Sequence, residues 1–200
     1  MIHALPGTGA DHRMYPAPWS TLPGFRAHDW GQSGDVRSIR QLAEVTVSAG
    51  GIADGDVLIG SSLGGMVACE ITKLRQISRL FLIGSAVRKE EVNPLWAEFH
   101  SLVEKVPLDW VRASARKLPG ELAAMFAAAD PEFVRAMCLA IFQWDGLGAT
   151  DTQVFRVHGR SDMVIPPPEH VDLLLNGGHL IALTHARECV DFVAGRLPRF

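Results

Sequence analysis

Short apolar runs alternate with longer segments of helical periodicity along most of the chain. Each apolar run is rich in Val, Ile, Leu or Phe and is bounded by Gly, Pro, Ser or Asp, as expected of buried strands. The predicted strands are Met1–Leu5, Phe25–His28, Val57–Gly60, Leu80–Ile83 and Val154–Val157. The predicted helices are Ser38–Ala49, Gly65–Arg75 and roughly His185–Leu197. This alternation favours a three-layer α/β fold, in which a mostly parallel sheet has helices on both faces.

The alternation breaks between about Arg88 and Thr150, where we expect no strand and at least three helices. Asn93-Pro94 and Asp130-Pro131 each place an N-cap residue before a proline at the first helical position. A helical segment inserted between two parallel strands is expected to cap the carboxyl edge of the sheet. Seven of the fifteen aromatic residues lie in this segment, most of them expected in the cap's own core: Trp96, Phe99, Trp110, Phe126, Phe133, Phe142 and Trp144.

The length of 200 residues suits one compact domain and is too short for two full-size ones. We therefore predict a core made of residues 1–87 and 151–200, with the helical cap of residues 88–150 inserted in it.

The composition narrows the class of function mainly by exclusion. A net charge of −3 without basic runs argues against nucleic-acid binding, and no apolar stretch is long enough to span a bilayer. The segment Met1–Leu5 is too short for a signal peptide. Cys69, Cys138 and Cys189 have no paired spacing, so we predict free thiols in a reducing compartment, with the cytoplasm as the expected location. The expected partner is a small-molecule substrate, and the oligomeric state is left open.

The sequence GSSLGG at residues 60–65 fits the pattern Gly-x-Ser-x-Gly in one register only, which is centred on Ser62. For Ser61 to be central, the residues two before and two after it would have to be glycine. A serine on a sharp turn between a strand and a helix needs small residues on both sides, and Gly60 and Gly64 meet that demand. The pattern alone occurs often by chance, but here an apolar strand precedes it and a helical pattern comes after it.

A serine hydroxyl needs a base to accept its proton, and His179 is the candidate. It follows the turn Asn176-Gly177-Gly178, which comes after the apolar stretch Val171–Leu175, so its ring could reach over the sheet edge. An exposed turn histidine would have the same spacing. The other histidines considered lie in strand-like runs, in the cap, at a strand end, after prolines or in the last helix: His3, His28, His100, His158, His170 and His185.

The base needs a carboxylate on its other ring nitrogen, and Asp162 is the candidate. It lies just past the strand Val154–Val157, whereas Asp145 and Asp151 precede that strand and Asp172 is a weaker rival. A single aspartate in a turn is more often a cap or turn former, so its weight comes from the order of the three residues.

Ser62, Asp162 and His179 each follow a predicted strand, so in a parallel sheet all three would lie at the carboxyl edge. "GSSLGG", "HGRSDMVIP" and "NGGHL" resemble the nucleophile elbow, acid turn and histidine loop of α/β-hydrolases, over nearly the whole chain. The chain opens on what resembles the family's third strand. The resemblance therefore implies a sheet of about six strands, all parallel, without the first two family strands.

The resemblance also implies an oxyanion hole made by the backbone N–H groups of Thr8 and Leu63. Thr8 lies in "LPGTG", and an ordinary Gly/Pro turn is the alternative interpretation of this segment. Two departures from the family stand out. Ser61 precedes the nucleophile where His or Gln is common, and the segment from Asp162 to His179 is so short that its helix must be stunted or missing.

These residues predict a serine hydrolase that cleaves an ester or thioester of a small apolar acid through an acyl-enzyme, without metal or organic cofactor. Two alternatives stay open: a ligand-binding protein with an idle triad, and a C–C hydrolase or lyase using the same residues.

Overall fold

The computed structural model describes residues 1–31, 35–93 and 120–198. Its sheet has six strands in the order β2-β1-β3-β4-β5-β6, and every neighbouring pair is parallel. The predicted all-parallel sheet of about six strands is therefore confirmed. The strands are β1 (Ile2–Leu5), β2 (Phe25–Ala27), β3 (Val57–Ser61), β4 (Arg79–Ile83), β5 (Gln153–Gly159) and β6 (Leu173–Leu175).

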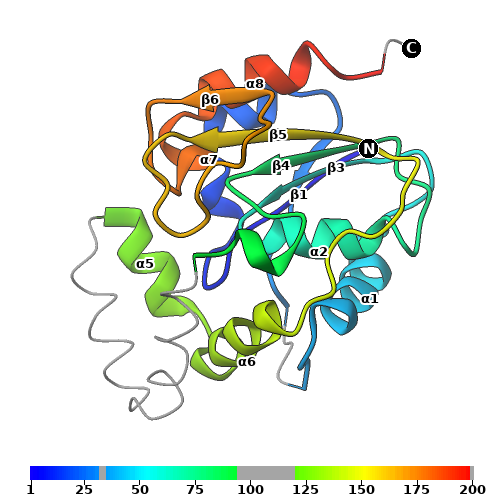
Figure 1. The fold of residues 1–200 in the computed structure, drawn as a ribbon, viewed down its shortest axis with the longest axis vertical. Helices are drawn as coiled ribbons and strands as arrows, with labels where there is room; N and C mark the ends of the chain where they lie inside the picture. The colour runs from blue at the N-terminus through cyan, green and yellow to red at the C-terminus, as the bar shows by residue number, and fades with distance from the viewer. Residues whose placement is uncertain (32–34, 94–119, 199–200) are drawn as a thin grey trace.

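Helices cover both faces of the sheet, as Figure 1 shows, with α1 and α2 on one side and α8 on the other. The α-helices are α1 (Ile39–Gly50), α2 (Leu63–Ile71), α5 (Gly120–Ala128), α6 (Pro131–Phe142), α7 (Ile181–Thr184) and α8 (Ala186–Ala194). Three short 3₁₀ helices are η1 (His12–Met14), η2 (Ala17–Thr21) and η3 (Lys89–Glu91). None of the helices in the described part of the chain is long and apolar enough to cross a membrane.

The alternation of side chains along the strands builds a separate core on each face. Leu58 and Leu80 pack with α1, α2 and α6, whereas Ile59 and Phe81 pack with η2, α7 and α8. Strands β1 and β3 are buried along their whole length, which explains why they are almost entirely apolar, with His3 as the buried polar residue of β1.

Helix α6 belongs to the main core as well as to the predicted cap segment. Asp130 caps it by accepting a hydrogen bond from the Glu132 N–H at 3.0 Å, as Asp130-Pro131 predicted. Phe133 and Trp144, expected in a separate cap core, are buried in the core shared with α1 and α2. The Trp144 indole N–H also donates to Glu70 on α2 at 2.8 Å. Trp96, Phe99, His100 and Trp110, together with the helix start predicted at Asn93-Pro94, fall outside the described residues.

Helix α1 lies within one residue of its predicted ends, whereas two other predicted helices differ more from the structure. Helix α2 begins at Leu63, two residues earlier than predicted, because the chain turns into the helix immediately after Ser62. It ends at Ile71 rather than Arg75, where the Thr72 hydroxyl donates to the Cys69 carbonyl at 2.8 Å and the backbone tightens. Helix α8 covers Ala186–Ala194, shorter than the predicted segment at both ends.

All three cysteines are free, as predicted. Burial raises the pKa of Cys189 to about 12 and also raises the pKa of Cys69 and Cys138. The neutral thiol is therefore favoured at each position, which is typical of structural cysteines rather than nucleophiles.

Candidate active site

Ser62 occupies the turn between β3 and α2 in a strained backbone conformation. Its φ of 53° and ψ of −122° make it the single non-glycine residue with positive φ in the described ranges. A Cβ atom at Gly60 would collide with the backbone of Gly64 and Gly65, and one at Gly64 would collide with the carbonyl of Leu5. The glycines on both sides of Ser62 are thus required by close backbone packing, which holds the strained turn in place.

His179 lies in the loop between β6 and α7 and contacts both other predicted residues. Its Nε2 is 2.9 Å from Ser62 Oγ, and its Nδ1 is 2.8 Å from Asp162 Oδ2. The His179 side chain keeps 16% of its surface exposed, whereas the Asp162 side chain is fully buried. The structure therefore brings together the three side chains that the sequence placed at one sheet edge.

Asp162 is oriented by the turn that follows β5. Its Oδ1 accepts hydrogen bonds from the backbone N–H groups of Val164 and Ile165, both at 2.9 Å. The other carboxylate oxygen is left for His179. The rival Asp172 is exposed and accepts from the Arg156 backbone N–H at 2.7 Å, so its carboxylate holds the β5–β6 edge instead.

The loops that carry Asp162 and His179 pack directly on each other, although no helix lies between β5 and β6 in the described chain. The Ser161 N–H donates to the Gly177 carbonyl at 2.9 Å. A Cβ atom at Gly159 would collide with the carbonyl of Gly178. These backbone contacts explain how a short connection still delivers the imidazole to Ser62.

Ser61 and His158 are polar, buried and close in sequence to the site, yet neither bonds to it. Among the described residues, Ser61 Oγ and both ring nitrogens of His158 have no hydrogen-bond partner. Burial, helped by the nearby charge of Arg156, lowers the pKa of His158 to about 4. A neutral, buried ring at this position is typical of a structural histidine.

The loop after β1 lies against the turn that carries Ser62. A Cβ atom at Gly7 would lie 3.4 Å from the Cβ of Ser62. The Gly7 carbonyl accepts from the Trp30 indole at 2.9 Å, and the Gly7 N–H donates to the sulfur of Met14 at 3.3 Å. Within the described chain no group accepts from the N–H of Thr8 or Leu63, so both donors are available for a ligand. Sequence reasoning missed Trp30 and Met14, because neither is part of a recognisable motif.

A cavity of about 620 Å³ opens beside this loop, between it and helices α5 and α6. Three residues that directly follow Thr8 contribute to its wall, Gly9, Ala10 and Asp11. The rest of the wall combines apolar and aromatic side chains with carboxylates: Trp30, Met125, Phe133, Asp29 and Asp130. The ring centroids of Trp30 and Phe133 are 6.1 Å apart.

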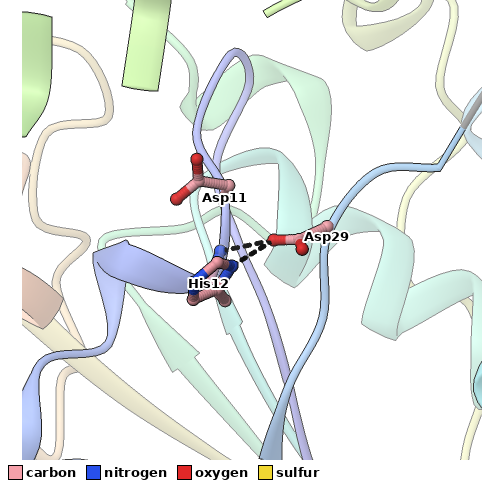
Figure 2. Close-up of side chains that lie close together, drawn as sticks. All are labelled: Asp11, His12 and Asp29. Atoms are coloured by element: carbon pink, nitrogen blue, oxygen red, sulfur yellow. Dashed lines mark hydrogen bonds and ion pairs between the residues drawn. The ribbon is translucent and has the colours of Figure 1, made fainter. Parts of the chain in front are cut away.

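Asp11, His12 and Asp29 form a polar cluster (Figure 2), and Asp11 and Asp29 also line this cavity. One possible ligand atom of each lies within 4.8 Å of the others, a proximity that their sequence spacing did not reveal. The Asp29 carboxylate accepts from both the backbone N–H and Nδ1 of His12, at 2.7 and 2.8 Å. Arg13 binds both oxygens of Asp11 and lowers the pKa of that carboxyl group. Because the guanidinium already neutralises Asp11, this cluster gives no support to a metal centre.

Comparisons with known proteins point to the same scaffold. A model of the alpha/beta hydrolase family matches residues 2–192. No curated protein matches the chain.

Several solved structures share the fold at low sequence identity. An esterase from Thermogutta terrifontis is 18% identical with a TM-score of 0.69, covering 97% of this chain and 88% of its own. A hydrolase from Oleispira antarctica is 17% identical with a TM-score of 0.74, covering 98% and 91%. An enol-lactonase from Burkholderia xenovorans is 18% identical with a TM-score of 0.75, covering 97% and 89%. At these identities the likeness establishes the fold alone.

Proposed function

The chain belongs to the alpha/beta hydrolase family, and on that premise we propose that it is a serine hydrolase of carboxylic esters or thioesters. The observation that supports this most is the contact of His179 with Ser62 at 2.9 Å and with Asp162 at 2.8 Å. A nucleophile, a base and a group that orients the base are the parts that acyl transfer to serine requires.

In the first step His179 acts as the general base. With its Nδ1–H donated to Asp162, the imidazole presents an unprotonated Nε2 to the Ser62 hydroxyl. Ser62 Oγ bonds to the substrate carbonyl carbon while its proton passes to Nε2. The buried Asp162 carboxylate holds the ring in this orientation and stabilises the imidazolium that forms.

Negative charge develops on the carbonyl oxygen during this attack. The N–H groups of Thr8 and Leu63 have no acceptor among the described residues and lie on the two segments that meet at Ser62. They are the donors we assign to the oxyanion. The Leu63 N–H is also the first of helix α2, whose N-terminal dipole favours negative charge.

The tetrahedral intermediate collapses with loss of the alcohol or thiol, which takes the proton from His179. Water then attacks the acyl group on Ser62 with His179 again as base, and release of the acid restores the hydroxyl. Each proton leaves and returns through the same nitrogen, so the scheme needs no further group.

The cavity beside the loop after β1 supports a substrate with a small, mostly apolar acyl or alcohol group. Trp30, Met125 and Phe133 offer apolar surface, and the cavity wall begins at Gly9, one residue after Thr8, although Ser62 and His179 are not part of that wall. The carboxylates of Asp29 and Asp130 at its wall oppose a substrate that carries its own negative charge.

A fluorophosphonate probe, which labels only activated serines, tests the proposal. We expect covalent labelling of the wild type, none in Ser62→Ala, and labelling slowed by at least a hundredfold in His179→Ala. Ser61→Ala is the matched control and should label at the wild-type rate. Labelling that survives Ser62→Ala would contradict the proposal. A folded wild type that does not label at all would favour the ligand-binding alternative.

A further inference from the structure

The peptide unit between Ser62 and Leu63 has a role at both of its ends. Its N–H, on Leu63, is a donor assigned to the oxyanion, so any catalytic importance of this peptide rests on the proposed function. Its carbonyl oxygen, on Ser62, lies in the same rigid plane and points the opposite way, because the peptide bond is planar and trans. Any group that fixes the direction of this carbonyl therefore also fixes the direction of the oxyanion donor.

The carbonyl of Ser62 is held by a side chain from the neighbouring strand. Ser85 lies just past β4, is fully buried, and its hydroxyl donates to the Ser62 carbonyl oxygen at 2.7 Å. The N–H groups of Gly65 and Met66 also reach this oxygen, at 3.0 and 3.4 Å, but both belong to the first turn of α2 and follow the same peptide. The hydrogen bond from Ser85 is thus the shortest of the three, and it alone connects the peptide to a different segment.

The surroundings of Ser85 keep its hydroxyl in this position. A Cβ atom at Gly65 would collide with the Ser85 side chain, so the glycine leaves the space that Ser85 fills. On its other side, the Ser85 carbonyl accepts from the Arg156 guanidinium at 3.3 Å. That guanidinium is in turn paired with the mostly buried carboxylate of Glu91, at 2.6 and 3.2 Å.

We propose that Ser85 is a positioning residue for the oxyanion hole, acting on the Leu63 N–H through the Ser62 carbonyl. Ser62 has a strained backbone, and a strained residue keeps its conformation only where neighbouring contacts determine it. The Ser85 hydroxyl is such a contact. It also polarises the peptide, which makes the N–H at the other end a stronger donor to the developing oxyanion.

The chain provides a matched pair of buried serines for the test. Ser85→Ala removes the hydroxyl that bonds the peptide, whereas Ser61→Ala removes a buried hydroxyl next to the nucleophile that has no partner in the described chain. For each variant we would measure kcat and KM with a small p-nitrophenyl ester and the Ki of a trifluoromethyl ketone. The ketone forms an adduct on Ser62 that places an oxyanion in the hole.

We expect Ser85→Ala to lower kcat about tenfold or more with KM unchanged, since removal of a whole oxyanion donor costs about 10²–10³ in kcat. The Ki of the ketone should rise by the same factor, a change that a purely structural role would not produce. Ser61→Ala should leave both quantities within about twofold. Ser85→Cys fills the site with a slightly larger and weaker donor and should lie between the wild type and Ser85→Ala, even if the alanine variant folds poorly.

Three results would overturn the inference. A folded Ser85→Ala or Ser85→Cys variant with wild-type kcat and ketone Ki would remove the role of Ser85 while leaving Ser62 as the nucleophile. A loss confined to thermal stability, with unchanged kcat in the folded fraction, would do the same. Failure of the fluorophosphonate probe to label the wild type would instead remove the proposed function and this inference together.

Discussion

Two hydrogen-bonded networks among the described residues have the form aspartate–histidine–third group, and they differ in the third group and in its surroundings. At the carboxyl edge, Asp162 bonds His179, which contacts Ser62. On the β1–β2 side, Asp56 bonds His3 at 3.1 Å, and the other nitrogen of His3 is 2.8 Å from His28. Hydrogen bonding between an acid and an imidazole is therefore not what makes a site.

The third group and its surroundings make the difference. The network of Asp162 and His179 ends in the Ser62 hydroxyl on a strained turn, beside two N–H groups with no acceptor among the described residues. The second ends in another histidine, and both of its rings are buried, stacked with centroids 5.1 Å apart. Burial lowers the pKa of His3 and lowers that of His28 to about 4, so a proton is excluded there rather than exchanged. We infer a catalytic role for the network that contains His179 and a structural role for the network that contains His3.

The largest expected effect on kcat comes from replacing the aspartate of each network by asparagine. Asp162→Asn should lower kcat by about 10³–10⁴, because the amide no longer holds the imidazole in the productive tautomer. Asp56→Asn should leave kcat within about twofold and instead lower the free energy of unfolding, because it weakens the bonds to His3 and to the N–H of Ala53. Steady-state kinetics and urea unfolding of both variants measure this contrast. Equal losses of kcat would show that the comparison is wrong.

A smaller effect is expected on stability in acid. The pKa values of His28 and His158 are lowered to about 4 in the folded protein, so between the ordinary histidine value and that pH the unfolded chain binds more protons. The stability contributed by keeping these two rings neutral is then fully present above about pH 6.5, falls as the pH drops, and is lost by about pH 4. At pH 5 each buried ring should reduce the free energy of unfolding by roughly 2 kcal/mol relative to pH 7.

Urea unfolding at pH 7 and pH 5 checks this expectation. His28→Gln removes one titrating ring and should lose less stability between the two pH values than the wild type does, whatever its stability at pH 7. An identical loss in both proteins would show that His28 takes no part in the acid sensitivity.

The sheet could be predicted from the sequence because its strands are short, apolar and separated by clear turns. A buried strand such as β3 forms an apolar run, and the alternation of such runs with helices implies a parallel order. Helix α6 marks the limit of such patterns. The pair Asp130-Pro131 predicted where this helix starts, but it does not say whether Phe133 faces a separate cap or the core it shares with α1.

Some residues of the candidate site could be predicted from the sequence and others could not. Ser62, Asp162 and His179 could be placed at one edge because each follows a strand, and the structure brings them within hydrogen-bonding distance. Ser85 also follows a strand, but no motif in the sequence singled it out. Its role depends on the direction of one hydroxyl, which no sequence pattern contains. The proximity of Asp11 to Asp29 likewise comes from the packing of two loops.

The most direct test of the proposed chemistry is to catch the acyl group on the enzyme. The wild type would be mixed with p-nitrophenyl butyrate, quenched in acid during turnover, digested and examined by mass spectrometry. We predict that one butyryl group is attached to Ser62 and none to Ser61 or to the cysteines. An ester that is hydrolysed without any such adduct, or with the adduct on a different residue, would contradict the assignment of Ser62 as the nucleophile.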